Sequence, residues 1–334
     1  MHERRAAILR AVVEEYVETA TPVGSGHVAQ RGGVGSPATV RNDMVALEQD
    51  GYLFQPHTSA GRVPTDKGYR FFVDTVVAPG QLTTGQRQEI RDVFARAHGA
   101  LEETLRDAST LLTRLTDCTA VVIGPPQGAA TVRSVQVVGL APRTALVVVV
   151  LSNGQVEKAA IELSDEAGED RLAAAARLLN AGLLGTTLVA VPVLPPTDDV
   201  AVEAVASAAV RALQTTSGAE PDRIFVGGAS RVAAAFSAAE TVRGVLTLLE
   251  QQYVLVGLLR QVLEVRSDGP SVAIGTESGV DALSQCALVV APYAGEGSSL
   301  GSVAVLGPTR MHYPETMAAV TAVSARLARW LAIG

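Results

Sequence analysis

The stretch that decides the fold runs from residue 36 to residue 74 and reads SPATVRNDMVALEQDGYLFQPHTSAGRVPTDKGYRFFVD. Ser36 is a favourable helix N-cap, and Pro37 suits the first helical position, where its missing N–H has no partner to lose. Three apolar residues then recur at helical spacing and form one stripe: Val40, Met44 and Leu47. This pattern predicts a helix that buries one side and exposes the other.

The residues on both sides of this helix complete a recognisable layout. Gly51 ends the helix, and two short strands around a polar tip are expected over residues 52–65, before another helix from Asp66. Upstream, apolar spacing predicts a helix over residues 3–20, and Ser25 can cap a short second helix that runs through Gln30. Three helices followed by a hairpin indicate a winged helix-turn-helix.

The exposed side of the central helix carries the candidate base-reading residues. These are Ala38, Arg41, Asn42, Val45 and Gln49. Arginine matches the two acceptors of guanine, and asparagine or glutamine matches the donor and acceptor of adenine. An ordinary solvated helix face would show the same pattern.

A second set of polar residues is expected to contact the DNA backbone or to form the wing. It consists of Ser36, Thr39, His57, Thr58, Ser59, Arg62, Lys67 and Arg70. The hairpin tip is expected at Ala60–Gly61, with Arg62 able to enter the minor groove. Polar hairpin tips are also common without any function, and His57 alone would be an ordinary surface histidine.

Three segments of the chain resemble the HrcA family, the heat-inducible transcription repressors of bacteria. They are residues 36–44, residues 55–70, and Gly307-Pro308-Thr309-Arg310-Met311 followed by Tyr313. The resemblance implies a repressor that binds an inverted-repeat operator, the CIRCE element, as a homodimer. It also implies that a GroE-type chaperonin modulates the repressor's activity.

The resemblance further implies an α+β multidomain fold. An N-terminal winged helix-turn-helix is followed by a GAF-like α/β domain that carries an inserted dimerisation domain. The expected boundaries are 1–78 for the DNA-binding domain, 79–117 for a connector helix, 118–165 with 235–334 for the GAF-like domain, and 166–234 for the insertion.

The connector is predicted as one long helix from about residue 84 to residue 116. Its apolar and small residues follow a heptad seam: Ile90, Phe94, Ala97, Leu101, Thr104, Ala108, Leu111 and Leu115. The seam favours packing on a partner copy or on its own domain, and an amphipathic helix on the next domain explains it equally well.

Beyond the connector, the pattern is mixed α and β. Strands are predicted at 119–124, 132–141, 144–151, 155–163, 271–276, 286–293 and 301–307, with a two-residue turn at Asn153–Gly154. Helices are predicted at 168–183, 198–217, 240–264 and 314–332.

Charge gives no general attraction to polyanions. The net charge is −7, and the first 76 residues hold eight basic against nine acidic side chains. DNA binding must therefore depend on where the basic residues lie, and few phosphates can be neutralised. Two isolated cysteines, no signal peptide and no apolar run long enough to cross a bilayer predict a cytoplasmic protein with no membrane partner.

No catalytic, cofactor or metal site is expected, and the chain is not predicted to be an enzyme. Gly297-Ser298-Ser299-Leu300-Gly301 matches the nucleophile-elbow pattern, but the residues after it read as a strand and not as a helix. The five histidines are scattered, without metal-ligand spacing.

Residues 307–311 are interpreted as a turn in which Arg310 forms an internal salt bridge, rather than as an anion site. A metabolite-gated regulator that senses a ligand through its GAF-like domain is the alternative function.

Overall fold

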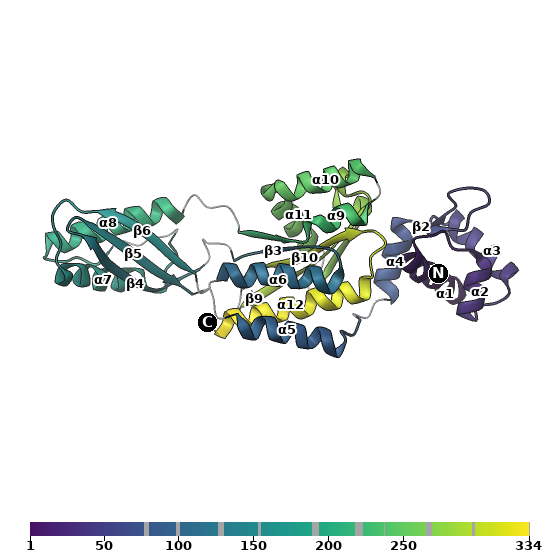
Figure 1. Cartoon of the computed structure of the whole chain (residues 1–334), viewed down its shortest axis with the longest axis horizontal. Helices are drawn as coiled ribbons and strands as arrows, with labels where there is room; N and C mark the ends of the chain where they lie inside the picture. Colours follow the sequence, from purple (N-terminus) through teal and green to yellow (C-terminus); the bar gives the residue numbers. More distant parts are fainter. Residues whose placement is uncertain are drawn as a thin grey trace.

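The computed structural model describes residues 1–76, 80–97, 101–125, 130–152, 155–188, 194–217, 223–236, 238–264, 269–295 and 298–333. The chain forms three units in a row (Figure 1). An N-terminal unit lies at one end, a central unit built on a five-stranded sheet lies in the middle, and an inserted unit with a three-stranded sheet lies at the other end.

The N-terminal unit packs four helices around a short antiparallel hairpin. Its elements are α1 (Glu3–Thr19), α2 (Ser25–Gly32), α3 (Pro37–Gln49), β1 (Leu53–Phe54), β2 (Val63–Pro64) and α4 (Asp66–Val76). The predicted apolar stripe of α3 is fully buried: Val40, Met44 and Leu47 are 0% exposed. It packs against α1, whose buried residues include Ile8 and Leu9.

The central unit is a five-stranded antiparallel sheet covered by helices on both faces. The strand order is β7-β3-β10-β9-β8, formed by Ile224–Gly227, Thr119–Ile123, Ser298–Pro308, Cys286–Gly295 and Ser271–Ile274. One face is covered by α5 (Thr84–Arg96), α6 (Leu101–Thr116) and α12 (Tyr313–Ile333). The other face carries α9 (Ala229–Ala235), α10 (Ala239–Glu250) and α11 (Gln252–Glu264).

Successive residues of β3 explain the two faces. Ala120 and Val122 point into the core under α6 and α12, whereas Val121 and Ile123 point into the core under α10 and α11. Side chains alternate across a strand, and a strand that is apolar at every position is therefore buried on both faces.

The prediction of one connector helix is wrong. The structure has two helices, α5 and α6, which pack on each other and on α12 within the central unit. The seam residues Ile90, Phe94 and Leu101 are buried there, and the indole N–H of Trp330 in α12 donates to the carbonyl of Ala97 at 2.9 Å. The apolar residues of the heptad pattern thus pack within the chain, between α5, α6 and α12.

The predicted boundaries of the insertion are also wrong. β4 (Val132–Ala141), β5 (Thr144–Leu151) and β6 (Val156–Glu162) pair with one another in a separate sheet and not with the central one. α7 (Glu169–Leu183) and α8 (Val200–Ser217) cover this sheet, so the inserted unit lies between residues 130 and 217 rather than 166 and 234. The sequence did not reveal which strands pair, because the alternation of apolar and polar residues along a strand is the same whichever sheet the strand joins.

The insertion separates two neighbouring strands of the central sheet. β3 and β7 are antiparallel partners, with Ala120 opposite Gly227 and Ile123 opposite Ile224, yet the whole inserted unit lies between them in sequence. The predicted turn at Asn153–Gly154 falls outside the described residues.

The helical region after the insertion is more broken than predicted. The predicted helix over 240–264 is two helices, α10 and α11, bent by 93° at residue 251, and α9 was not predicted. Within the part of the chain that the structure describes, no single helix is long and apolar enough to span a bilayer, and α10 with α11 satisfies the length and composition test only as a bent pair.

The serine-containing run near residue 299 lies in a strand. Ser299 pairs with Ala294 of β9 inside β10, whereas a nucleophile elbow requires a strand, a sharp turn and then a helix. Gly297 lies outside the described residues. The segment thus has the strand setting that the sequence predicted.

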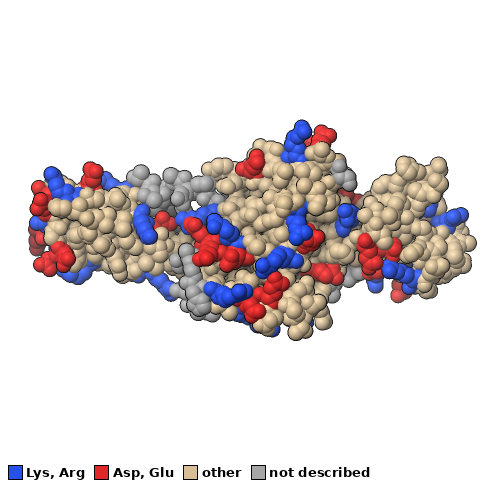
Figure 2. Space-filling view, in the orientation of Figure 1, with Lys and Arg blue, Asp and Glu red and all other residues tan. Residues whose placement is uncertain are grey.

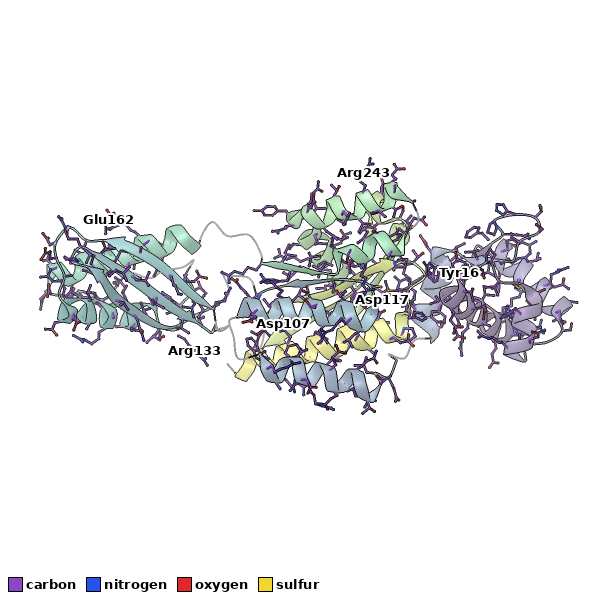
Figure 3. All side chains as sticks on the ribbon, viewed as in Figure 1. Tyr16, Asp107, Asp117, Arg133, Glu162 and Arg243 are labelled. Carbon is purple, nitrogen blue, oxygen red and sulfur yellow. The ribbon has the colours of Figure 1, made fainter. Side chains whose placement is uncertain are left out.

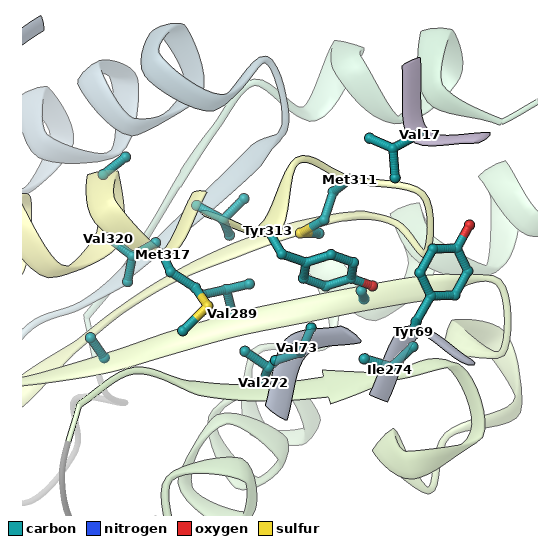
Figure 4. Packing of buried hydrophobic residues seen from close by; sticks show 14 of the residues in the cluster. Val17, Tyr69, Val73, Val272, Ile274, Val289, Met311, Tyr313, Met317 and Val320 are labelled. Atoms are coloured by element: carbon teal, nitrogen blue, oxygen red, sulfur yellow. The ribbon is translucent and has the colours of Figure 1, made fainter. Parts of the chain in front are cut away.

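The N-terminal and central units share one hydrophobic cluster (Figure 4). Tyr69 and Val73 of α4 pack beside Met311 and Tyr313, which lie at the start of α12. The rings of Tyr69 and Tyr313 have centroids 6.0 Å apart. Because all four side chains are buried, this contact helps fix how the N-terminal unit sits on the rest of the molecule.

Candidate nucleic-acid interface

The five predicted base-reading residues lie together on the solvent-exposed face of α3. Their side chains are all exposed: Ala38, Arg41, Asn42, Val45 and Gln49. Arg41, Asn42 and Gln49 form no hydrogen bond or ion pair with any described residue. Three polar groups are therefore available to an external partner on one helix face.

The start of α3 is held by the cap that the sequence predicts. The hydroxyl of Ser36 accepts a hydrogen bond from the backbone N–H of Thr39 at 3.3 Å, and the two hydroxyl oxygens lie 3.0 Å apart. Ser36 and Thr39 thus order the first turn, with Pro37 at the first helical position. The backbone N–H groups of this turn lie beside the exposed face of α3.

The exposed tip of the hairpin is formed by His57, Thr58 and Ser59. The side-chain amide of Gln55 donates to the carbonyls of Thr58 at 3.1 Å and Ala60 at 2.8 Å, which holds the loop closed. Sequence reasoning placed Gln55 in the wing but did not identify this role, since nothing in the pattern distinguishes a loop-closing amide from a solvated one.

The prediction that Ala60–Gly61 forms the tip is wrong. Gly61 lies against the segment between α1 and α2, and a Cβ atom there would be 2.4 Å from the backbone carbonyl of Val23. Val23 and Arg62 exchange two backbone hydrogen bonds of 2.9 Å beside it. Glycine is therefore required at position 61 by a close backbone approach and not by the turn.

Arg62 lies close to the interface but is bound to another side chain. Its guanidinium donates from Nε to a carboxylate oxygen of Glu48 at 3.1 Å, and only 12% of the Arg62 side chain is exposed. This ion pair fastens the hairpin to α3. Arg62 is thus poorly placed for the minor-groove contact that the sequence predicted, unless the pair to Glu48 opens.

Lys67 lies on the surface at the start of α4. Its ammonium donates to the backbone carbonyl of Asp50 at 2.8 Å and lies 4.4 Å from the centroid of the Tyr52 ring. The charge remains exposed, because these two contacts do not neutralise it. A phosphate can therefore still approach Lys67.

Arg70 points away from α3, into the junction with the central unit. It forms an ion pair with Glu277, donates to the carbonyl of Val272 at 2.7 Å and approaches Asp74 at 3.4 Å. In the same junction, Asp66 accepts from the backbone N–H of Thr276 at 3.2 Å. Arg70 thus holds the two units together in this structure, a role that its sequence context did not disclose.

A buried carboxylate that sequence reasoning did not single out anchors α3 to α1. Asp43 accepts hydrogen bonds from Arg4 at 2.8 Å and Arg5 at 3.3 Å, and its side chain is only 8% exposed. The hydrogen bond from Arg4 lowers the pKa of Asp43, with a smaller contribution from Arg5, against the opposing effect of burial. Its burial could have been predicted from its position, because Asp43 lies three residues after Val40 and four before Leu47, on the edge of the buried stripe.

We expect the attachment of α3 to weaken in acid. A carboxyl group whose folded-state pKa is lowered stabilises the fold at pH values above its unfolded pKa of about 3.9. This stabilisation is lost as the pH falls through the folded-state pKa. The Asp43→Asn variant should therefore be less stable than the natural chain at neutral pH, with a difference that shrinks below about pH 4. The stability difference between the two chains is measured by thermal unfolding, followed by circular dichroism, at neutral pH and below about pH 4. A difference independent of pH would show that the charge of Asp43 contributes nothing.

The charge pattern around the interface is mixed. On the face shown in Figure 2, most of the N-terminal unit shows no charged side chain, acidic and basic side chains lie next to one another along its lower edge, and no continuous basic surface appears. Binding of a polyanion must then rely on a few placed contacts rather than on a strong overall field.

The HrcA family matches most of this chain. The family described as HrcA protein C terminal domain matches residues 102–317. A heat-inducible transcription repressor HrcA from Nocardioides sp. is 40% identical over 338 residues, covering 98% of each chain. The same-named protein of Acidothermus cellulolyticus is 40% identical over 342 residues, covering 99% of each chain.

A crystal structure of a hypothetical protein shares the fold. It superposes with a TM-score of 0.71 over all of this chain and 99% of its own, at 23% sequence identity. The chain is thus a mixed α/β protein of a known architecture.

These relatives define the class as a transcription repressor and not an enzyme. The chain belongs to the HrcA family, as its sequence motifs predicted.

Proposed function

We propose that this chain is a heat-inducible, sequence-specific repressor whose N-terminal unit is a winged helix-turn-helix. The exposed face of α3 supports this proposal, because the side chains of Arg41, Asn42 and Gln49 have no partner among the residues that the structure describes. A helix of this kind fits the major groove, where each base pair presents a distinct pattern of donors and acceptors.

Within this interface, Arg41 and Asn42 are proposed to read bases, with Gln49 beside them. Ala38 and Val45 would supply apolar contact, for example with a thymine methyl group. Ser36, Thr39, His57, Thr58, Ser59 and Lys67 are proposed to contact the backbone or the minor groove. Because Arg62 and Arg70 are engaged by Glu48 and Glu277, we assign them to holding the hairpin and the junction rather than to DNA.

The proposal is tested by binding to an operator duplex that carries the inverted repeat of the CIRCE type. The comparison is a scrambled duplex of the same length and composition, measured across a salt series. A preference of about a thousandfold or more is expected of a specific repressor. Equal and weak binding to both duplexes would reject sequence-specific recognition by the purified form.

We also propose that the repressor acts as a homodimer, joined in part through the inserted unit. One face of its sheet is covered by α7 and α8, while the other face exposes apolar side chains: Val138 at 47%, Leu140 at 60% and Val156 at 48%. Exposed apolar side chains gathered on one face are typical of interaction sites. The proposed partner on this face is a second copy of the chain, because an inverted-repeat operator presents two half-sites and each half-site is read by one copy.

Leu140→Glu is expected to shift the chain from dimer to monomer, because it places a charge in the proposed contact. Light scattering coupled to size exclusion measures the mass. Val200→Glu is the control, because Val200 is 77% exposed at the start of α8, a helix that covers the opposite face of the sheet. If both variants keep the mass of the natural chain, the dimer contact lies elsewhere.

Heat induction is proposed to act through the active fraction of the repressor, which a GroE-type chaperonin restores in the cytoplasm. A chain of marginal stability can couple its folded fraction to the supply of chaperone. Purified protein should lose operator binding on mild heating and regain it with chaperonin and ATP. Full activity after heating without chaperonin would contradict this part of the proposal.

The alternative, a regulator gated by a metabolite in a GAF-like central unit, is not favoured by the relatives. Both are named for heat induction and for repression, and neither name points to a ligand. We therefore infer only a GAF-like architecture for the central sheet and its helices, and architecture alone does not establish a sensor.

A further inference from the structure

Arg310 does not form the internal salt bridge that the sequence predicted. It lies in the turn between β10 and α12, half-buried, and makes no hydrogen bond or ion pair with any described residue. Charged side chains withdrawn from water are normally paired, since desolvation of an unpaired charge is costly. Arg310 is therefore available to a partner from outside the chain.

The guanidinium lines a pocket of about 290 Å³ where three parts of the molecule meet. Tyr16 comes from α1 of the N-terminal unit, Thr241 from the first turn of α10, and Gln285 and Thr309 from the two ends of the β9–β10 hairpin. Figure 3 shows Tyr16 at the edge of the N-terminal unit that faces the central unit. A molecule in this pocket would touch both units at once.

The polar groups around the pocket can all donate hydrogen bonds. Arg310 offers N–H groups, Tyr16, Thr241 and Thr309 offer hydroxyls, and Gln285 offers an amide. Among the described residues that line the pocket there is no aspartate or glutamate. A pocket with a fixed cation, neutral donors and no carboxylate has the chemistry of an oxyanion site.

None of the carboxylates that the structure describes forms an ion pair with Arg310. Asp117, Arg231 and Arg310 all act on the neighbouring thiol of Cys118, and Asp117 already forms an ion pair with Arg231. Asp66 also acts with Arg310 on the hydroxyl of Tyr69, but its carboxylate accepts hydrogen bonds from Thr276. The N-cap of α10, Ala238, also lines the pocket and provides no side-chain acceptor for the N–H groups of that helix.

We propose that this pocket binds a small oxyanion, a phosphate or a carboxylate, and that Arg310 holds it through paired hydrogen bonds. The planar guanidinium fork matches two oxygens of either group. The volume suits a small molecule rather than a large cofactor. Bound between Tyr16 and Arg310, the anion stabilises the junction of the N-terminal and central units. This binding does not depend on whether the N-terminal unit recognises DNA.

Thermal unfolding of the full chain tests the site, with inorganic phosphate and succinate titrated separately at constant ionic strength and pH against chloride. At least one anion should raise the melting temperature of the natural chain along a saturable curve, by about 2–4 °C. Arg310→Gln should lose that rise. Arg243→Gln, which removes an exposed arginine of α10 outside the pocket, should keep it.

The two anions identify the source, because a rise with phosphate alone favours phosphates and a rise with succinate alone favours carboxylates. An equal rise in the natural chain and in Arg310→Gln would overturn the proposal, since phosphate also stabilises proteins by exclusion from their surface. The absence of a saturable rise with either anion would overturn it too. If Arg310→Gln does not fold, isothermal titration of Arg310→Lys against the natural chain replaces it, with weaker binding expected once the fork is lost.

Discussion

Arg41→Ala and Asn42→Ala are each expected to weaken binding to the operator by roughly 1–3 kcal/mol, which is about 5- to 150-fold in affinity. Both side chains are exposed on α3 and have no partner in the described part of the chain. Their removal should therefore leave the fold intact and remove only contacts with bases. Affinity is measured by fluorescence anisotropy for the operator and for duplexes with single base changes.

The loss should be specific to sequence. For each variant, discrimination should disappear at one operator position and persist at the others, because one side chain reads one base pair. Lys67→Ala is the control, since a phosphate contact should weaken binding to every duplex about equally. If Arg41→Ala and Asn42→Ala also weaken all duplexes equally, these residues do not read bases.

Gly275→Ala is expected to lower stability by about 2–4 kcal/mol through positive-φ strain and overpacking together. Gly275 has φ +55°, and an added Cβ would lie 2.2 Å from the carboxylate of Asp66. The carboxylate of Asp66 would have to turn away and give up its hydrogen bonds to Thr276. This should loosen the attachment of α4 to the central unit beside the pair of Arg70 and Glu277. Operator affinity should fall as well, because dimeric readers need their recognition helices at a fixed spacing.

Gly279→Ala separates the strain from the clash. Gly279 has a similar φ of +69°, but nothing lies within 4 Å of its added Cβ. Chemical denaturation gives the loss of unfolding free energy for each variant. The amount by which the loss in Gly275→Ala exceeds that in Gly279→Ala is the cost of disturbing the junction. That excess should shrink when Asp66 is also changed to Ala. An operator affinity unchanged in Gly275→Ala would mean that this junction does not set the spacing.

Local sequence was sufficient to place most elements. Ser36 and Pro37 marked the start of α3, and the helix begins there because the cap and the missing N–H act within one turn. The strands at 119–123, 132–141 and 144–151 follow from alternation and β-branched residues in the same way. Such signals depend on neighbours along the chain, so one sequence contains them fully.

The errors came from residues whose partners lie far away in sequence. The seam of Ile90 and Phe94 packs on α12, more than two hundred residues later, and nothing in the seam distinguishes this from a partner copy. Arg310 was expected to pair within the chain, and Arg70 was expected to contact DNA. The structure instead joins Arg70 to Glu277, and Arg310 forms no ion pair with any residue in the described ranges.

The sequence by itself determined the family, the order of most helices and strands, and the polar face of α3, because motifs and periodicity are local properties. Only the tertiary structure decided which strands share a sheet, how α4 is fastened to the central unit, and which arginines remain available. Those outcomes depend on contacts between distant residues, where burial and charge pairing select one partner among many that the sequence allows.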